Sequence, residues 1–529
     1  MGKKILKRFF ITLGVVAGLI ILFFAIISSK QQVQIITHEN ELIEFSYPAI
    51  FTAKVTESKK LEIENAIDEI HHINLTLFGQ KIGYYELVER QLGNGTTFLF
   101  ERVKNNSWVP FPVKTIHKLG ESIESSNSWN PKEIEHSYHP DFGEDPTVNP
   151  WGMIVTEGKQ VLKGNVYISK EMTTDYGYNK TSIIRKLDKE IRKTTISNTA
   201  IKQTYWTLPE RYAESWSLVS KEDLFTSKYA QSEWVEFSLV NQTSQLNWLT
   251  SDGPFTKLPH SIEPGPKMGY GRAMGRFEDD IALTWYEKDG SLFHETMALN
   301  SRVNLLSYLQ EYEGTRWPTE YTSMWLKNAY GLHAPYVDTR FNEYIAFYLD
   351  KMSTTFDDEI SQDTQYVPLY ADYLLTRVAN KDIIEVDQGY LIVDYFDDLV
   401  ETPITHASLN HELGGLKILL SAYEITGNEK YLNVAKDVTS GIETFGIDTG
   451  GWIRDTGDLW YQAKPDGTFS GDDYPQLTLV DLLETQAMFE KLKMPRNAYF
   501  DEMIESKMTF LENNNIELID KVTNLLDVD

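Results

Sequence analysis

The segment 450–461 near the C-terminus mixes charged and aromatic side chains densely. It reads GGWIRDTGDLWY, a composition that does not suit a buried helix. Aromatic rings stack on the apolar faces of sugars, and an arginine can hold a carboxylate with two parallel hydrogen bonds. These residue types predict a carbohydrate site, and a structural loop closed by an Arg–Asp pair fits them equally well. The candidate residues are Arg454, Asp455, Trp452, Trp460 and Tyr461.

Two more polar segments lie close to this candidate site in the sequence. Within 470–475, Asp472 and Asp473 precede a predicted helix, where a carboxylate can cap the helix N-terminus or ligate Ca²⁺. We expect at least one of them to act as a cap, and Ca²⁺ is the one cofactor that the sequence leaves open. His406 and Asn410 begin another predicted helix and are expected to face one end of a helix bundle as substrate-binding residues.

Several common catalytic motifs are missing from the sequence. The pair His411 and Glu412 does not make a zinc motif, because Gly415 stands where a second histidine is needed. The segment 269–275 has the wrong glycine spacing for a dinucleotide-binding loop. The chain contains no cysteine, which excludes thiol catalysis.

Helices are the elements that must position these residues. From about residue 296 onward, apolar residues recur at spacings of three and four, as on one face of an amphipathic helix. One stripe runs from Leu409 to Tyr423 and stops at Gly427, and Asn428 caps the next helix. Paired helices with short connections fit an α-solenoid or a closed α/α toroid, and the lack of a strict repeat of about 34 residues favours the toroid. Further helices are expected over 299–312, 318–330, 366–379 and 476–491.

The region before these helices is predicted to be rich in strands. Residues 31–155 are expected to form a small α+β region with a helix over 54–73, a strand over 96–103 and a terminal linker. Residues 156–295 are expected to form a β-rich domain with one helix at 183–193. The expected strands of that domain include 232–240, 280–288 and 291–299. The predicted fold class is a multidomain α+β chain with a transmembrane helix, the α+β region 31–155, the β-rich domain 156–295 and an α/α toroid over 296–529.

The N-terminal residues have the pattern of a membrane anchor. Residues 9–27 carry no charge, and at about 1.5 Å per residue they nearly span a hydrocarbon core of about 30 Å. A basic tail over 1–8 precedes them, so the positive-inside rule places the N-terminus in the cytoplasm. A cleaved signal peptide is the competing interpretation, but no small-x-small cleavage site follows. The predicted localisation is the cell membrane, single-pass through residues 9–28, with the bulk extracellular on a Gram-positive bacterial surface, which the absence of cysteine fits.

The charge balance limits the partners. The chain carries 77 acidic and 50 basic residues, a formal net charge of −27. Residues 1–29 hold four of the bases and no acid, so the remainder has 46 bases against 77 acids, or −31. This acidic excess argues against nucleic acid as a partner. The expected partners are a polysaccharide substrate and the membrane, with a homodimer left open.

Three blocks in the C-terminal 130 residues carry a family resemblance. The first is TPITHASLNHELGGLKILLSAYEITG, which begins at Thr402. The second is GWIRD from Gly451, and the third is DYPQLTLVDLLE from Asp473. The blocks are similar to a Thr-Pro and Leu-Asn pattern, a Gly-x-Ile-Tyr-Asp pattern and an Asp-Tyr-His tract, in the same order. In these blocks the chain resembles the C-terminal α/α-toroid domain of the D-glucuronyl C5-epimerases, which act on heparosan-type polysaccharides.

The resemblance implies epimerisation of uronic acid residues at C5. That reaction needs a base and an acid on opposite faces of the sugar, together with groups that stabilise the intermediate aci-carboxylate. By resemblance, Tyr474 and Glu401 are the expected proton-transfer residues. Arg454 and His406 would hold the carboxylate, and Trp452 and Trp460 would stack on the sugar.

The blocks also depart from the family pattern. Arg454 replaces the tyrosine of the second block, Pro475 replaces the histidine of the third, and Val400 stands where a tyrosine neighbours the family's glutamate. Two alternatives therefore remain. One is a polysaccharide lyase or hydrolase on the same toroid, since inverting hydrolysis uses two carboxylates about 6.5–9.5 Å apart. The other is a non-catalytic glycan-binding or cell-wall protein, which the missing tyrosines favour. The candidate carboxylates for hydrolysis are Asp398, Glu401, Asp455 and Asp458.

Overall fold

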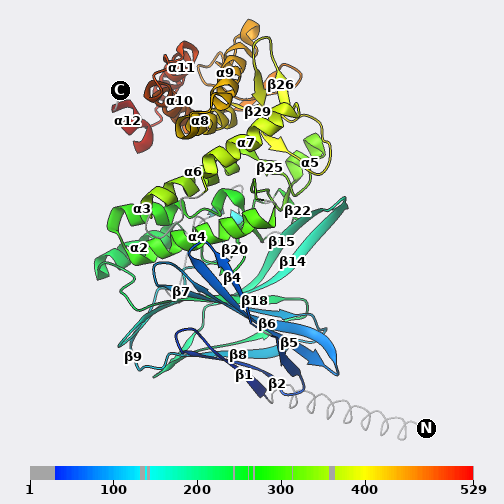
Figure 1. Ribbon diagram of the computed structural model, residues 1–529, viewed down its shortest axis with the longest axis vertical. Coiled ribbons are helices and arrows are strands. Elements are labelled where there is room, and N and C mark those ends of the chain that lie inside the picture. Colours follow the sequence, from blue (N-terminus) through cyan, green and yellow to red (C-terminus); the bar gives the residue numbers. More distant parts are fainter. Residues whose placement is uncertain are drawn as a thin grey trace, which may run out of the picture.

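The computed structural model shows strands in the first half of the chain and helices in the second. It describes residues 30–56, 58–130, 138–139, 143–241, 245–259, 261–265, 268–312, 314–356 and 364–527. The two halves stack along the long axis of the molecule (Figure 1). This order is consistent with the predicted β domain followed by an α/α toroid.

Two antiparallel sheets dominate the first half. The smaller follows the order β1 (Lys30–Ile36), β2 (Leu42–Pro48), β8 (Phe111–Lys118), β17 (Ala200–Thr207) and β16 (Thr195–Ser197). The larger follows the order β21 (Thr256–Lys257), β23 (Gly269–Gly271), β15 (Lys180–Ile191), β14 (Val166–Gly177), β18 (Tyr212–Ser220), β7 (Thr97–Asn105), β6 (Gln80–Gln91), β5 (Ala66–Leu77) and β3 (Thr52–Val55). Four further strands join the larger sheet, namely β4 (Lys59–Ile63), β9 (Ile123–Ser128), β12 (Gly152–Thr156) and β13 (Gln160–Lys163).

The larger sheet has an apolar core on each face. Successive side chains of a strand point to opposite faces, so β7 sends Leu99 to one side and Phe98 and Phe100 to the other. On the side of Leu99, Phe45 of the smaller sheet stacks on Tyr85 with ring centroids 4.1 Å apart. Phe98 and Phe100 belong to a second cluster, shared with the helices that cover the opposite face (Figure 1). The architecture is therefore sheet on sheet on helix.

Helices and short strands make up the second half. The helices that cover the sheet or follow it are α2 (Lys228–Val240), α3 (Asp280–Asp289), α4 (Leu292–Glu311), α5 (Met324–Tyr330) and α6 (Thr339–Thr355). The remainder are α7 (Tyr366–Ala379), α8 (Leu409–Thr426), α9 (Glu429–Thr444), α10 (Leu477–Lys491), α11 (Ala498–Asn513) and α12 (Asp520–Asp527), around one apolar core. The short strands that matter below are β19 (Leu249–Thr250), β20 (Gly253–Pro254), β27 (Tyr390–Ile392), β28 (Tyr395–Phe396), β29 (Ala407–Ser408), β30 (Trp460–Ala463) and β31 (Phe469–Asp472).

The helix ends predicted from capping residues are confirmed. Helix α8 ends at Gly427, whose φ of 66° is left-handed, a conformation that glycine adopts without a side-chain clash. Asn428 then caps α9 by accepting a hydrogen bond from the backbone N–H of Lys430. Helices α7 and α10 agree with the expected ranges 366–379 and 476–491 within a residue.

Several predicted elements of the first half are wrong. The expected helices at 54–73 and 183–193 are strands, the first covering parts of β3 to β5 and the second most of β15. Their isoleucines suit a pleated strand, and tertiary pairing overrides the helical spacing. Conversely, the expected strands at 232–240, 280–288 and 291–299 lie in α2, α3 and α4, because their apolar residues pack onto the sheet as helix faces.

The predicted fold class is also wrong in its first element, the transmembrane helix. No helix among the described residues is long and apolar enough to cross a membrane. The segment 9–28, on which the anchor was predicted, lies outside the described residues. The fold class is corrected to a β-rich half followed by a helical half. The predicted single-pass localisation at the cell membrane depended on that helix and is corrected with it.

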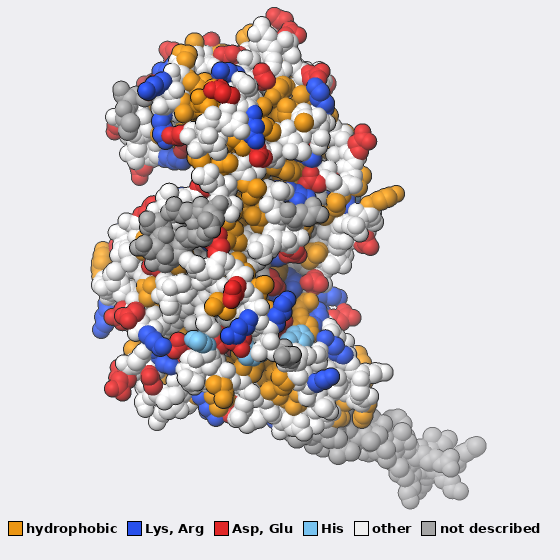
Figure 2. All heavy atoms as spheres, in the orientation of Figure 1, with side chains coloured by type: hydrophobic (Ala, Val, Ile, Leu, Met, Phe, Trp, Pro, Cys, Tyr) orange, Lys and Arg blue, Asp and Glu red, His pale blue; other side chains and the backbone are white. Residues whose placement is uncertain are grey.

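Charges on the visible face of the molecule are mixed. Acidic and basic side chains are interspersed over both halves, and apolar side chains gather over the helices at the top (Figure 2). A buried arginine connects the larger sheet to the helical half. Arg90 of β6 is fully buried and donates to both carboxylate oxygens of Asp68, at 2.8 Å each. It also donates to Asn300 and Asn304 of α4, at 2.8 and 2.6 Å, and so ties the sheet to the helix that covers it.

Replacing Arg90 by methionine should destabilise the protein strongly. The substitution leaves the Asp68 carboxylate and two amides buried without their donor, which costs about 3–5 kcal/mol. Urea denaturation measures the change. The control is Lys381→Ala, since Lys381 and Glu385 are more than 70% exposed and such a pair contributes about 0.5 kcal/mol or less. Equal effects of the two substitutions would contradict the assigned role of Arg90.

Candidate functional site

A buried carboxylate, Asp394, organises one end of the helical half. Asp394 lies between β27 and β28 and has no exposed surface. One of its oxygens accepts a hydrogen bond from the backbone N–H of Ser408 at 2.7 Å, and the other accepts from the Ser408 hydroxyl. Ser408 is the N-cap residue of α8, but its hydroxyl is used by Asp394 and not by its own helix. The start of α8 is therefore fixed to the carboxylate.

Two histidines lie against the same carboxylate. His406 Nε2 is 3.1 Å from one Asp394 oxygen. The geometry does not make a well-aligned hydrogen bond, so the contact is mainly electrostatic. His411 Nδ1 is 3.7 Å from the other oxygen. Burial alone would raise the pKa of Asp394, but His411, His406 and the Ser408 hydroxyl together hold that pKa below its ordinary value. Asp394 is thus a negative charge that can stabilise a positive one on His406.

His406 connects this carboxylate to a tyrosine. Its Nδ1 lies 3.0 Å from the hydroxyl of Tyr330, the last residue of α5. Because Nε2 faces the carboxylate, we assign the ring proton to Nε2, which leaves Nδ1 as an acceptor for the Tyr330 proton. Burial raises the pKa of Tyr330, so this tyrosine holds its proton at neutral pH. Tyr330, His406 and Asp394 form a chain in which a hydroxyl, an imidazole and a carboxylate follow each other as in a catalytic triad.

Aromatic rings surround this chain. The His406 ring centroid lies 5.2 Å from Trp325, 5.5 Å from Tyr395 and 6.5 Å from Tyr461. Tyr461 meets the edge of Tyr474 at 5.6 Å. Trp325 and Tyr474 are each about half exposed, at 47% and 48%, so the rings lead from solvent to the buried histidine. Such a surface suits the apolar faces of sugar rings.

The structure brings together three of the residues that the sequence predicted for the site. His406, Tyr461 and Tyr474 meet here, because β30 pairs with β29 directly after His406. Arg454 lies on the neighbouring hairpin, where it contacts Asp472 at 2.5 Å and covers the ring of Trp460 at 4.7 Å. These hairpin residues are contiguous with the aromatic surface through β31 and the segment that follows it.

The other predicted residues lie elsewhere or are buried. Trp452 has no exposed surface and donates its indole N–H to a backbone carbonyl, so it cannot stack on a sugar. Asn410 is buried, and its backbone carbonyl accepts from Arg340. Glu401 and Asp455 are on the surface. The residues predicted for one site are therefore divided between the core and the surface.

The predicted Ca²⁺ ligands are engaged in other contacts. Asp473 is buried in an ion pair with Lys507 at 2.8 Å, and Asp472 pairs with Arg454. Across the described part of the chain, no group of three or more His, Asp or Glu side chains is arranged to hold a metal ion. Neither aspartate caps α10, whose N-cap residue is Gln476.

The sequence reasoning missed Asp394, Tyr330 and Trp325. A single acid after the apolar run at 391–393 is a signal for a buried carboxylate, because an unpaired charge there would be costly. No local pattern marks Tyr330, which lies 76 residues before His406 in the chain. Only the tertiary fold brings the two together.

Comparisons with known proteins add little to this geometry. No protein-family model and no curated protein matches the chain. Among solved structures, the chain is similar to a D-mannose isomerase (12% identity, TM-score 0.31, covering 45% of this chain and 58% of that one, less than two thirds of its length). It is also similar to the cellobiose 2-epimerase of Bacillus thermoamylovorans (14% identity, TM-score 0.36, covering 54% of this chain and 70% of that one). A third similar structure is a family 76 glycoside hydrolase of a bovine Bacteroides thetaiotaomicron strain (12% identity, TM-score 0.34, covering 74% of this chain and 78% of that one). The names of all three are those of carbohydrate enzymes, but likenesses of this size carry no argument, and the site is judged on its own residues.

His411 should make the stability of this region depend on pH. Burial, with Arg340 and His406 nearby, lowers the pKa of His411 to about 4, although Asp394 opposes the shift. The unfolded chain binds a proton near pH 6.5, so stability is complete above that pH and is lost as pH falls toward 4. Between pH 7 and pH 4.5, His411→Gln should lose about 2 kcal/mol less stability than the wild type, measured by urea denaturation at both pH values. Identical losses would contradict a neutral, buried His411.

Proposed function

We propose that this chain is a carbohydrate-active enzyme that moves a proton at C5 of uronic acid residues in a polysaccharide. The chain from Tyr330 through His406 to Asp394, behind a half-exposed aromatic surface, is the observation that carries the proposal. Sugar chemistry at C5 depends on proton transfer, and a tyrosine that can pass its proton to a histidine backed by a carboxylate is a suitable acid and base.

The proposed reaction balances without a cofactor. A base removes the C5 proton, and the electron pair of the C–H bond moves into the adjacent carboxylate to give an aci-carboxylate. An acid then returns a proton to the opposite face of C5, and the carboxylate is restored. Tyr330, connected to His406, serves on one face, and the hydroxyl of the half-exposed Tyr474 serves on the other.

Arg454 is proposed to hold the carboxylate of the sugar. The side chain of its partner Asp472 is 85% exposed. An exposed ion pair of this kind contributes about 1 kcal/mol or less to the free energy of folding. Arg454 can therefore exchange Asp472 for a substrate carboxylate at little cost. The stacked Trp460 ring keeps the guanidinium plane in place during this exchange.

Elimination is the second candidate function. A lyase also begins by removing the C5 proton, but then expels the group at C4 in place of reprotonation. The observation that favours it is that only one tyrosine, Tyr330, has a histidine and a carboxylate behind it among the described residues. Of the carboxylates considered for hydrolysis, Asp398 is held by Arg316 and Arg377. Asp458 is paired with Lys507, so only Glu401 and Asp455 are left for that reaction.

Proton exchange at C5 tests the proposal directly. The purified protein is incubated in D₂O with glucuronate-containing polysaccharides, and the C5 proton signal is followed by NMR. We expect this signal to disappear, and we expect Tyr330→Phe to slow its loss by about 100-fold or more, as for the removal of a general acid or base. The control is Tyr229→Phe, since Tyr229 is 71% exposed on α2 and should leave the rate unchanged.

The remaining outcomes separate the alternatives. An unsaturated product that absorbs in the ultraviolet would assign elimination in place of epimerisation. Binding of the polysaccharide without any exchange, in the wild type as in Tyr330→Phe, would contradict the proposal and indicate a glycan-binding protein.

A further inference from the structure

A second aspartate, Asp338, lies beside the chain from Tyr330 to Asp394. It ends the short strand β25 (Val337–Asp338), which pairs with β28 so that Asp338 stands opposite Tyr395. The backbone N–H of the next residue, Thr339, donates to the carbonyl oxygen of Asp394 at 3.0 Å. Backbone pairing therefore holds the two aspartates in neighbouring segments, although they are far apart in the sequence.

The carboxyl group of Asp338 is only partly used by its own helix. Asp338 is the N-cap residue of α6, and one of its oxygens accepts from the backbone N–H groups of Arg340 and Phe341, at 3.0 and 3.2 Å. The other oxygen accepts no hydrogen bond from any described residue, and it is not among the polar atoms that are sealed from solvent. Because Asp338 is only 7% exposed, this oxygen is reached through a small opening in an otherwise buried group.

The rings around Asp338 continue the aromatic surface of the candidate site. The Tyr395 ring approaches Tyr336 at a centroid distance of 5.9 Å and His406 at 5.5 Å. Burial raises the pKa of Tyr336, Tyr395 and Tyr461, and the nearby negative charge of Asp338 adds to the shift in each. Asp338 thus borders the surface on which we propose that the sugar binds.

Two hydroxyls beside Asp338 are also open to a ligand. The hydroxyls of Tyr336 and Tyr395 form no hydrogen bond within the part of the chain that the structure describes, and neither is sealed from solvent. A carboxyl group and hydroxyls with unused hydrogen-bonding capacity, next to aromatic rings, match the polar edge and the apolar face of a sugar ring.

The surroundings of Asp338 favour its neutral form. Burial raises the pKa of Asp338 to about 7; the backbone N–H groups of its cap and the guanidinium of Arg340 oppose the shift, and the charge of Asp394 adds to it. His406 and His411 lie against Asp394. The charged and titratable groups that act on Asp338, or on which it acts, are Asp394, Arg340, Tyr321, Tyr336, Tyr370, Tyr395 and Tyr461.

We propose that Asp338 determines which sugars the site accepts, because its neutral form donates a hydrogen bond to a bound uronate and its ionised form repels that anion. A neutral hexose of the same shape carries no charge and is not repelled by either form. The inference rests on the carbohydrate-directed function proposed above, but it does not depend on which residues transfer the proton at C5.

The expected size of the effect follows from the protonated fraction of Asp338. Two carboxylates repel each other more strongly in a buried site than in water, because the effective dielectric constant is lower. Only the protonated fraction is then competent to bind a uronate, and the apparent Kd is the intrinsic Kd divided by that fraction. With a pKa of about 7, the fraction falls from about nine-tenths at pH 6 to about one-tenth at pH 8, so the Kd rises about tenfold.

NMR titration of the intact protein with methyl β-D-glucuronide and methyl β-D-glucoside tests this inference. The two probes differ only at C6, which is a carboxylate in the first and a hydroxymethyl group in the second. We expect the Kd of the glucuronide to rise about tenfold between pH 6 and pH 8, and the Kd of the glucoside to stay constant. This comparison uses the wild type alone, so no effect of a substitution on folding enters it.

Asp338→Asn removes the charge and keeps the helix cap, because asparagine caps a helix N-terminus as well as aspartate does. We expect this variant to bind the glucuronide equally at both pH values, with about the Kd of the wild type at pH 6. The matched control is Asp279→Asn, since Asp279 is also a buried N-cap aspartate, and its hydrogen bonds are with Ala282 and Ser301 at the start of α3. The control should retain the pH dependence of the wild type.

Each contrary result overturns the inference. The same pH dependence for both probes would remove the role of charge repulsion, and a wild-type pH dependence in Asp338→Asn would assign the effect to another group. Absence of glucuronide binding at pH 6 would overturn the site itself. Proton exchange at C5 without this pH dependence would leave the proposed function standing, whereas pH-dependent binding without exchange would overturn only the proposed function.

Discussion

The buried charge of Asp394 is the constraint on which the candidate site depends. A carboxylate that is shielded from water needs hydrogen-bond donors or positive charges around it, because an unpaired buried charge costs several kcal/mol. The backbone N–H and hydroxyl of Ser408, together with the His406 ring, supply that match. In doing so they fix the first turn of α8, the orientation of the His406 ring and the acceptor nitrogen that faces Tyr330. The need to pair the buried Asp394 thus also sets the orientation of His406 on which the chemistry proposed for Tyr330 depends.

The β-rich half supports the same site from outside. The hairpin of β14 and β15 extends from the sheet toward the short elements around α5 (Figure 1). Near its tip, Tyr176 lies against His333 with ring centroids 4.1 Å apart, and Lys180 pairs with Asp397. Lys327 of α5 is held by Glu263 at 2.5 Å. Because α5 carries Tyr330, contacts from both halves determine where the tyrosine hydroxyl lies.

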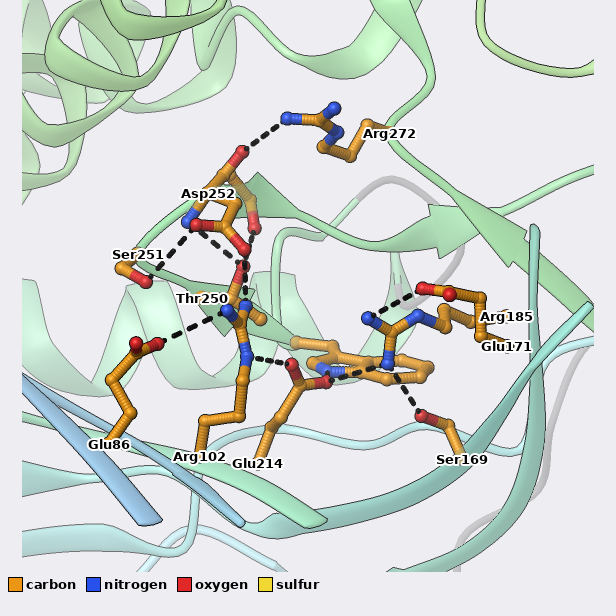
Figure 3. A network of polar contacts seen from close by, with 12 residues as sticks. Glu86, Arg102, Ser169, Glu171, Arg185, Glu214, Thr250, Ser251, Asp252 and Arg272 are labelled. Atoms are coloured by element: carbon orange, nitrogen blue, oxygen red, sulfur yellow. Dashed lines mark hydrogen bonds and ion pairs between the residues drawn. The ribbon is translucent and has the colours of Figure 1, made fainter. Parts of the chain in front are cut away.

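The sequence predicted the helical half better than the sheets. Capping residues such as Gly427 and Asn428 act locally, and their effect can be read from a few neighbouring positions. The residue spacing over 183–193 predicts a helix, but the segment forms most of strand β15. In the fold, Arg185 is buried and pairs with Glu171 and Glu214 (Figure 3), which no local pattern reveals.

The contrast between local signals and distant contacts also explains which residues of the candidate site the sequence predicted. His406 and Tyr474 stand in polar blocks of the sequence that can be recognised on their own. Their partners depend on distant contacts: Tyr330 comes from 76 residues upstream, and the role of Asp394 exists only when Ser408 and the two histidines surround it. Trp452 shows the opposite error, since a tryptophan in a polar segment was expected at the surface and is fully buried.

A crystal structure of the protein with a bound glucuronate-containing oligosaccharide tests the central claim most directly. The account predicts a sugar ring against the aromatic surface, with its carboxylate at Arg454 and its C5 hydrogen directed toward the hydroxyl of Tyr330 or Tyr474. A uronate bound away from both hydroxyls would contradict the account.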